Sequence, residues 1–288
     1  MNPNAVGHPL TATPGINEFT KRNVTGFATR KNASAEYSEY LSFNPSVLTA
    51  IYSNECLISE RTIMKDLLSK SLSVSLFFQI LSITISLFGL TLNVSLKDQI
   101  LVTALRLETF VSAIQFSFYT WYSYHFREVA EATFYRYHDW MITTPIMLLT
   151  TMIYFDYNNN PDKETTLESF WEEHRADILI VFAFNVIMLI FGYLFEVGVL
   201  DLFTSNTLGF AGLIGSFYVI YNSFVSKNLP ANLPLFAFMS LVWGSYGVAA
   251  TLSPTLKNVF YNLIDAVSKN FYGIFLTYVV YQKSYSLK

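Results

Sequence analysis

The residues best suited to chemistry lie in an apolar run near the C-terminus, residues 258–281, which carries Asp265 and Lys269 close to its middle. A charged side chain at the centre of a bilayer costs at least ~2.5 kcal/mol, so charges at that depth usually mark a functional site. The spacing of four residues places both side chains on one face of a helix, where the acid can neutralise the base. A purely structural ion pair would show the same spacing. A lysine in an apolar pocket can also be held as the nucleophilic amine, so the segment predicts a site for an aldehyde cofactor.

The composition places this run in a membrane. The chain is 52% hydrophobic and only 14% charged, whereas soluble domains average about 25% charged residues. The net charge of −3 is too small to indicate a nucleic-acid partner. One cysteine, Cys56, excludes both a disulfide within the chain and a cysteine metal cluster. The expected partner is therefore the lipid bilayer, and neither a metal site nor nucleic-acid binding is predicted.

The chain divides into a polar extension, residues 1–67, a helical domain, residues 68–284, and a short tail, residues 285–288. The helical domain is a series of apolar segments of about 20 residues, the length needed to cross ~30 Å of hydrocarbon. Most connections between them are short, so successive helices must pack as antiparallel neighbours. The sequence predicts an all-α membrane protein, a bundle of seven transmembrane helices. The seven segments are residues 69–92, 99–124, 133–155, 177–197, 202–226, 233–252 and 258–281.

The third segment holds a second group of charged and polar residues. Arg136 and Asp139 are three residues apart, so the arginine can lie one turn from the carboxylate and stabilise its charge. Thr143, one turn further on, can hydrogen-bond to Asp139 or to the helix backbone. Buried charges seldom add net stability, so two carboxylates, an arginine and a lysine in two helices are hard to explain by packing alone. We therefore expect Asp139 to lie near Lys269.

These residues resemble two motifs of the microbial (type 1) rhodopsins, which bind retinal as a Schiff base on a lysine of the seventh helix. The run RYHDWMITTP at 136–145 is similar to the third-helix motif of that family, and Asp265-x-x-x-Lys269 to its seventh-helix motif. Trp243-x-x-Tyr246 resembles the sixth-helix pocket pair, and Tyr119 the second-helix tyrosine. The resemblance covers about residues 69–284. The Asn-, Tyr- and Phe-rich composition is similar to that of rhodopsins from giant viruses or marine protists.

The resemblance implies roles for individual residues. Lys269 would hold all-trans retinal, and Asp139 and Asp265 would be the counterions of the Schiff base. A proton and water network would include Arg136, Thr143, Tyr119 and Tyr246. The retinal pocket would be lined by Trp140, Thr144, Met147, Asn185, Met188, Gly192 and Trp243.

The family also implies an orientation, with the N-terminus outside and the C-terminus in the cytoplasm, and a homo-oligomer. It implies a photoreceptor or transporter rather than an enzyme.

Departures from the proton-pump pattern keep three functions open. In the pumps of this family, a carboxylate in the inner half of the third helix usually returns a proton to the Schiff base. This chain has Thr150 at that position, so the returning proton is expected to come from bulk water. The connection at 253–257 contains no glutamate to release protons outward, and Gly247 replaces a proline. Channel-type relatives line a pore with second-helix glutamates, and Glu108, together with Thr150, is a candidate for such an ion pathway. An outward light-driven proton pump is the leading hypothesis, with a light-gated cation or proton channel and a sensory photoreceptor as alternatives.

Overall fold

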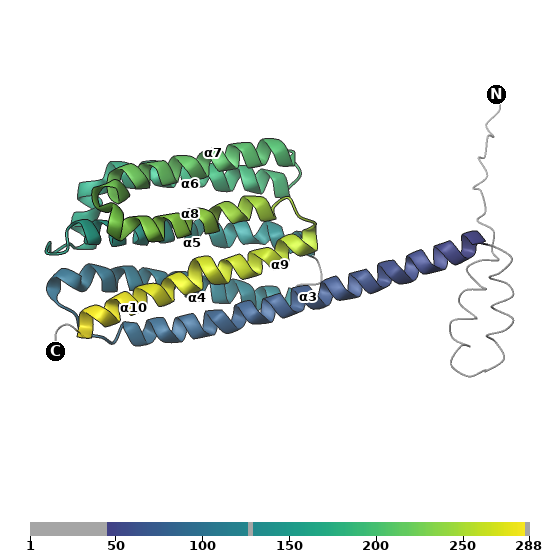
Figure 1. Cartoon of the computed structure of the whole chain (residues 1–288), viewed down its shortest axis with the longest axis horizontal. Helices are drawn as coiled ribbons and strands as arrows, with labels where there is room; N and C mark the ends of the chain where they lie inside the picture. Colours follow the sequence, from purple (N-terminus) through teal and green to yellow (C-terminus); the bar gives the residue numbers. More distant parts are fainter. Residues whose placement is uncertain (1–44, 126–128, 286–288) are drawn as a thin grey trace, which may run out of the picture. The chain divides into compact units, whose positions relative to one another are not determined.

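The computed structural model of the protein describes residues 45–125 and 129–285, in which helices and their connections occur and strands do not (Figure 1). Contacts divide the chain into residues 1–62 and 63–288. The helical bundle described below is the second of these units. Most of the predicted N-terminal extension, and the tail after residue 285, lie outside the described residues, so both remain predictions.

The seven predicted segments correspond to seven helical rods in this part of the chain. Short 3₁₀ and π turns, named η, extend or interrupt several of them. The long helices are α3 (Pro45–Gly89), α4 (Gln99–His125), α5 (Val129–Asn159), α6 (Leu167–Glu196), α7 (Leu202–Ile220) and α8 (Leu229–Ala249). The last rod consists of α9 (Pro254–Asp265), η4 (Ala266–Asn270) and α10 (Phe271–Tyr285). The remaining short turns are η1 (Leu96–Asp98), η2 (Tyr221–Val225) and η3 (Ser226–Asn228).

Four stretches of the described chain are long and apolar enough to cross a membrane by length and composition: residues 62–89, 96–125, 167–196 and 202–249. The last of these contains both α7 and α8. The two rods outside this set are α5 and α9–α10, which are also the rods that carry Arg136, Asp139, Asp265 and Lys269. The two rods that are least like an apolar membrane span therefore carry the charged residues of the candidate site.

Contacts between rods bring α5 and the last rod, which carry these residues, together. α4 packs on α5 and on α10, α5 packs on α9, and α6 packs along α7 (Figure 1). The last rod is interrupted at η4, a π turn of five residues that ends at Asn270 and includes Lys269. A π turn widens the helix locally, and such turns occur often at functional sites.

Local sequence explains where α6 and α7 begin. Thr166 and Ser169 form a capping box at the start of α6, in which each side chain bonds to the backbone of the other. Asp201 caps α7 by accepting hydrogen bonds from the Thr204 backbone N–H at 3.0 Å and from its hydroxyl at 2.6 Å.

The Asp201 cap predicts a pH-dependent stability. The hydrogen bonds from the Thr204 side chain and backbone lower the pKa of Asp201. A lowered folded-state pKa means that the stabilisation is present above the ordinary aspartate pKa and is lost as the pH falls through the lowered value. Asp201→Ala should therefore lower the Tm at neutral pH, and the difference from the unchanged protein should vanish in acid. Thermal unfolding from pH 7 to pH 3 measures this, with Asp201→Asn, which keeps an acceptor oxygen, as the control. An equal Tm loss for Asp201→Asn would contradict the cap.

Candidate functional site

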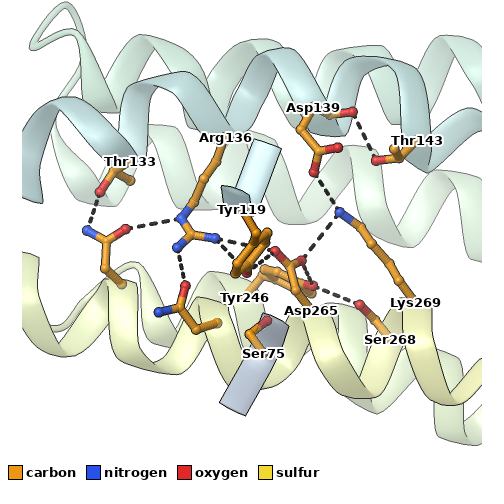
Figure 2. Close-up of polar contacts among 12 residues, drawn as sticks. Ser75, Tyr119, Thr133, Arg136, Asp139, Thr143, Tyr246, Asp265, Ser268 and Lys269 are labelled. Atoms are coloured by element: carbon orange, nitrogen blue, oxygen red, sulfur yellow. Dashed lines mark hydrogen bonds and ion pairs between the residues drawn. The ribbon is translucent and has the colours of Figure 1, made fainter. Parts of the chain in front are cut away.

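Lys269 lies between Asp139 and Asp265, the two carboxylates that were predicted from the sequence to lie near it (Figure 2). Its Nζ is 2.9 Å from Oδ2 of Asp139 on α5 and 3.5 Å from Oδ1 of Asp265, one turn earlier on its own rod. All three side chains are buried. The predicted meeting of the third and seventh segments is therefore present, and a single lysine nitrogen faces two acids inside the bundle.

The two carboxylates differ in how many groups stabilise their charge. Asp265 accepts hydrogen bonds from Tyr119 at 2.7 Å and from Tyr246 at 2.6 Å, and it also pairs with Arg136 at 3.3 Å (Figure 2). In Asp139, Oδ2 faces Lys269, while the buried Oδ1 accepts no hydrogen bond from the described residues. A carboxylate can accept about four hydrogen bonds. Asp265 is therefore the well-stabilised anion, and Asp139 is the carboxylate with capacity left for a proton.

Arg136 is fully buried and is held by polar groups of two rods. Its Nε donates to Asn258 at 3.1 Å, and one terminal nitrogen donates to Asn262. The other terminal nitrogen donates to Tyr119 at 2.9 Å (Figure 2). The sequence suggested that Arg136 would stabilise Asp139, but its carboxylate partner in the structure is Asp265. Asn258, Asn262 and Asp265 recur every three or four residues on one face of α9, a pattern that could have predicted these contacts.

Thr143 does not bond to the Asp139 carboxylate. Its hydroxyl donates to the backbone oxygen of Asp139 at 2.9 Å, and Thr144 donates in the same way to Trp140 at 2.7 Å. Of the two options that the sequence left open for Thr143, the structure therefore has the bond to the helix backbone. Pro145 follows directly and has no amide hydrogen to contribute to the α5 ladder.

A cavity extends from Lys269 between α5, α6, α7 and α8. Its walls include Trp140 on α5 and Trp243 on α8. Of the seven predicted pocket residues, Asn185 alone is missing from the wall, because it lies behind Thr144 and donates to the Thr144 hydroxyl at 2.9 Å. The residues that line the cavity as predicted are Trp140, Thr144, Met147, Met188, Gly192 and Trp243.

The contribution of α7 to this cavity was not predicted. α7 supplies the wall residues Ser205, Asn206, Gly209, Phe210 and Leu213. The sequence of α7 contains no charged residue that would mark one face. Phe210 also accounts for the glycine at 247, because a Cβ there would collide with the Phe210 ring.

The expectation that no carboxylate lies near Thr150 is wrong. The Thr150 hydroxyl donates to Oε1 of Glu108 on α4 at 2.5 Å, and the Glu108 side chain is fully buried. Arg106, two residues before Glu108 on α4, is exposed. The sequence suggested no carboxylate at this level because the motif assigns it to the third helix, whereas the structure supplies it from the second.

A buried ion pair lies at the opposite end of the bundle, beyond Arg136. Lys257 bonds both oxygens of Glu196, at 2.6 and 2.8 Å. Lys257 directly precedes Asn258, which binds Arg136. The 253–257 connection itself has no glutamate, as the sequence showed, but α6 supplies one beside it.

Comparison with known structures places this bundle among the microbial rhodopsins. The viral rhodopsin OLPVRII has a TM-score of 0.65 and 29% identity, over 75% of this chain and 98% of that one. A blue light-absorbing proteorhodopsin from Med12 (TM-score 0.59, 17% identity) covers 75% of this chain and 97% of its own. The bromide-bound halorhodopsin of Halobacterium salinarum (TM-score 0.56, 15% identity) covers 77% and 96%. The last two likenesses show the fold alone. Comparison with curated proteins gave no match.

The match to a family model covers most of the bundle. Residues 68–283 match the model described as bacteriorhodopsin-like protein. The matched range begins within α3 and ends within α10, and it contains the five rods between them, the two charged motifs on α5 and α9–η4, and the cavity that reaches Lys269. The chain therefore belongs to the bacteriorhodopsin-like protein family.

Proposed function

We propose that this protein is a light-driven outward proton pump with all-trans retinal bound to Lys269. Membership of the family implies a retinal chromophore and a multi-pass membrane protein, and together with the related structures it supports light-driven ion transport in general. The transported ion, the direction of transport and the retinal isomer are the specific content of the proposal.

The residues that line the cavity suit retinal chemically. A polyene needs apolar walls, and the cavity is walled by two tryptophans, Trp140 and Trp243, and by Met147 and Met188. The same cavity is lined by Lys269, the amine that would join the aldehyde. When bound, retinal supplies light absorption and a change of shape next to the Lys269 nitrogen. The surrounding side chains exclude water and hold that nitrogen against the two acids.

The unequal stabilisation of Asp139 and Asp265 is the observation that carries the proposal. Asp265 is held by two tyrosine hydroxyls and Arg136, whereas Asp139 has Lys269 as its hydrogen-bond donor. Proton transfer from Lys269 Nζ to Asp139 Oδ2 needs movement across 2.9 Å and no rearrangement of the Asp265 cluster. We therefore assign Asp139 as the proton acceptor and Asp265 as the permanent anion.

Glu108 supplies a candidate group for returning a proton to Lys269 from the other side. Its Oε1 accepts from Thr150, and its buried Oε2 has no hydrogen-bond partner among the described residues. A buried carboxyl group that forms no ion pair with the described residues is best accommodated in its neutral form, which holds a proton. An acceptor on one side of the lysine and a protonated acid on the other are the two parts that one-way transport requires.

The direction of proton transport follows from the membrane orientation that the family implies, which we adopt as part of the proposal. With the N-terminus outside, Asp139, Arg136 and the Glu196–Lys257 pair lie on the outer side of Lys269. Glu108 and Thr150 then lie on the cytoplasmic side. Transfer from Lys269 to Asp139 is thereby outward. The homo-oligomer stays a prediction.

A light-gated channel is the second candidate. The favouring observation is that Glu108 shares a buried face of α4 with Ser112 and Gln115, which is a row of polar side chains at membrane depth. A row of this kind could line a pore.

Photocurrents under voltage clamp separate these functions. We expect an outward current at every voltage that does not depend on sodium or potassium. In Asp139→Asn the acceptor loses its charge, and the current should fall at least about tenfold because proton acceptance is lost. An exposed change, Asp162→Asn, is the control. A current whose direction reverses with the ion gradient would show that the protein is a channel and not a pump. Absence of current in a protein with normal colour would indicate a sensor.

A further inference from the structure

A second cavity, which we call the lateral groove, lies between α8 and α10 against α5. It shares no lining residue with the cavity that reaches Lys269. Its volume is about 350 Å³. No charged side chain lines it, and most of its wall consists of the aromatic rings of Tyr154, Phe238, Phe271, Tyr272 and Phe275.

The packing of the two rods explains why this space exists. α8 packs on α9 and η4, whereas α10 packs on α4, and toward its end α10 runs away from α8 (Figure 1). On α8 the wall includes Ala231 and Pro234, whose small side chains do not close the widening space. The groove is therefore a product of the rod geometry together with small residues at its border.

The side of the groove toward the bundle is closed by packed rings. Tyr272 is 1% exposed, and its hydroxyl accepts from Thr151 at 3.3 Å, so its polar end is bonded inside the bundle. The ring centroid of Phe275 lies 5.3 Å from that of Tyr154 and 6.3 Å from that of Tyr272. These three rings form an apolar back wall.

The other side of the groove is open at membrane depth. Phe271 lies two residues after Lys269 and is 43% exposed, and Phe238 is 40% exposed. Along α8 the groove extends over seven residues, from Ala231 to Phe238, which corresponds to about 10 Å. The surrounding solvent at this depth is hydrocarbon, and a wall of rings offers water few of the polar partners that it needs. A hydrocarbon chain would instead gain dispersion contacts with the rings.

Two lysines lie where α5 and α10 end and α8 begins, an end that we call the inner end. Lys227 Nζ is 6.0 Å from the centre of the Phe224 ring, and Lys283 Nζ is 5.1 Å from the centre of the Tyr157 ring. Asn159, at the end of α5, donates to the backbone oxygen of Phe224 at 2.9 Å, so both rings belong to this end. Lys227 precedes Ala231 by four residues and thus lies about one helical turn from the groove.

The rods that border the groove carry no acid that would cancel these lysines. Residues 202–264 and 266–288 contain neither aspartate nor glutamate. The acids of the inner end are instead on and around the α5–α6 connection, residues 156–177. An apolar groove with lysines alone beside its end complements a lipid that has a hydrocarbon chain and an anionic head group.

We propose that the lateral groove and the two lysines form a binding site for an anionic phospholipid. One acyl chain lies in the groove against Phe238, Phe271 and Phe275, and the phosphate lies beside Lys227 and Lys283. In the membrane orientation adopted above, the inner end faces the cytoplasmic leaflet, where anionic lipids are concentrated. The site does not depend on which ion the protein transports.

The head-group part of the site is tested by native mass spectrometry. The full chain with retinal is taken from bilayers of equal parts phosphatidylglycerol and phosphatidylcholine, and the lipid that stays bound is identified. A lysine near the membrane surface contributes about fivefold to the affinity for an anionic lipid, so Lys227→Gln should lower retention of phosphatidylglycerol about fivefold. Adding Lys283→Gln should bring the loss to about twentyfold.

Lys163→Gln is the matched control, because it removes the same charge at the inner end but on the α5–α6 connection. It should retain phosphatidylglycerol as the unchanged protein does. Equal retention of the two lipids by the unchanged protein, or an equal loss in Lys163→Gln, would overturn the site.

The groove part is tested with a phosphatidylglycerol that carries a photoreactive group on its acyl chain. We expect covalent labelling at Phe238, Phe271 or Phe275. Ala231→Phe fills the groove and should remove most of this labelling, whereas Ala237→Phe, the same change at an exposed position of α8 outside the groove, should not. Ala231→Leu serves if Ala231→Phe does not form a coloured, folded protein.

Two outcomes of the labelling would overturn the groove. Phe203 and Leu241 are 81% and 77% exposed and do not line it, so equal labelling at these positions would show contact with bulk lipid only. Cross-links from the groove to a second copy of the chain would show that protein covers it instead. Both measurements are made in the dark, so failure of the proposed function leaves them unaffected.

Discussion

Lys269→Ala is expected to abolish visible absorption after retinal is added. Lys269 is the buried amine that lines the cavity, and its Nζ is held between two carboxylates at 2.9 and 3.5 Å. Without that amine no covalent link to the aldehyde forms. Absorption spectra of purified protein measure this directly. A stable long-wavelength pigment in this variant would refute the assignment of Lys269.

Two further variants separate loss of the link from loss of the fold. Removing one partner of a buried ion pair typically costs ~3–5 kcal/mol, so Lys269→Ala should also be less stable. Lys269→Arg keeps a positive charge between Asp139 and Asp265 but offers no amine of suitable nucleophilicity, so it should remain colourless. Lys227→Ala, an exposed lysine, should form pigment normally.

Glu108→Gln should have the second largest effect, by slowing return of the proton to Lys269 at least about tenfold at neutral pH because the internal acid is lost. The amide can still accept the Thr150 hydroxyl, so the local packing should persist. Light-driven current should fall in proportion to the slower cycle. Flash photolysis with parallel photocurrents measures both quantities.

The pH dependence of this variant tests the mechanism more closely. With Glu108 present, reloading should change little between pH 6 and 8, because the proton comes from within the protein. In Glu108→Gln it must come from bulk water, so the rate should fall about tenfold for each unit that the pH rises. Glu172→Gln, an exposed change on α6, should behave as the unchanged protein. An unchanged rate in Glu108→Gln would exclude Glu108 as the donor.

The sequence predicted the fold and the centre of the site well, because both depend on local patterns. Segment length and apolar composition predicted the seven rods. The i to i+4 spacing predicted that Asp265 and Lys269 lie on the same face of the last rod. Buried charges in two different rods are costly unless they pair, so the charged residues of these rods were expected to lie together. Lys269 does contact Asp139.

Contacts that depend on the packing of several rods were not predicted. Thr150 suggested that no carboxylate lies at this level, because a motif register compares positions within one helix, whereas the carboxylate beside Thr150 comes from α4. The choice of Asp265 as the partner of Arg136 depends on how α5 packs on α9, which sequence spacing does not determine.

Time-resolved infrared spectroscopy tests the central claim most directly, since it follows protonation of individual carboxyl groups after a light flash. The carboxyl band of Asp139 should appear as Lys269 loses its proton, and the carboxyl band of Glu108 should disappear as Lys269 regains one. Asp139→Asn and Glu108→Gln assign the two bands. Appearance of the first band from Asp265, or a Glu108 that never changes protonation while protons are pumped, would contradict the account.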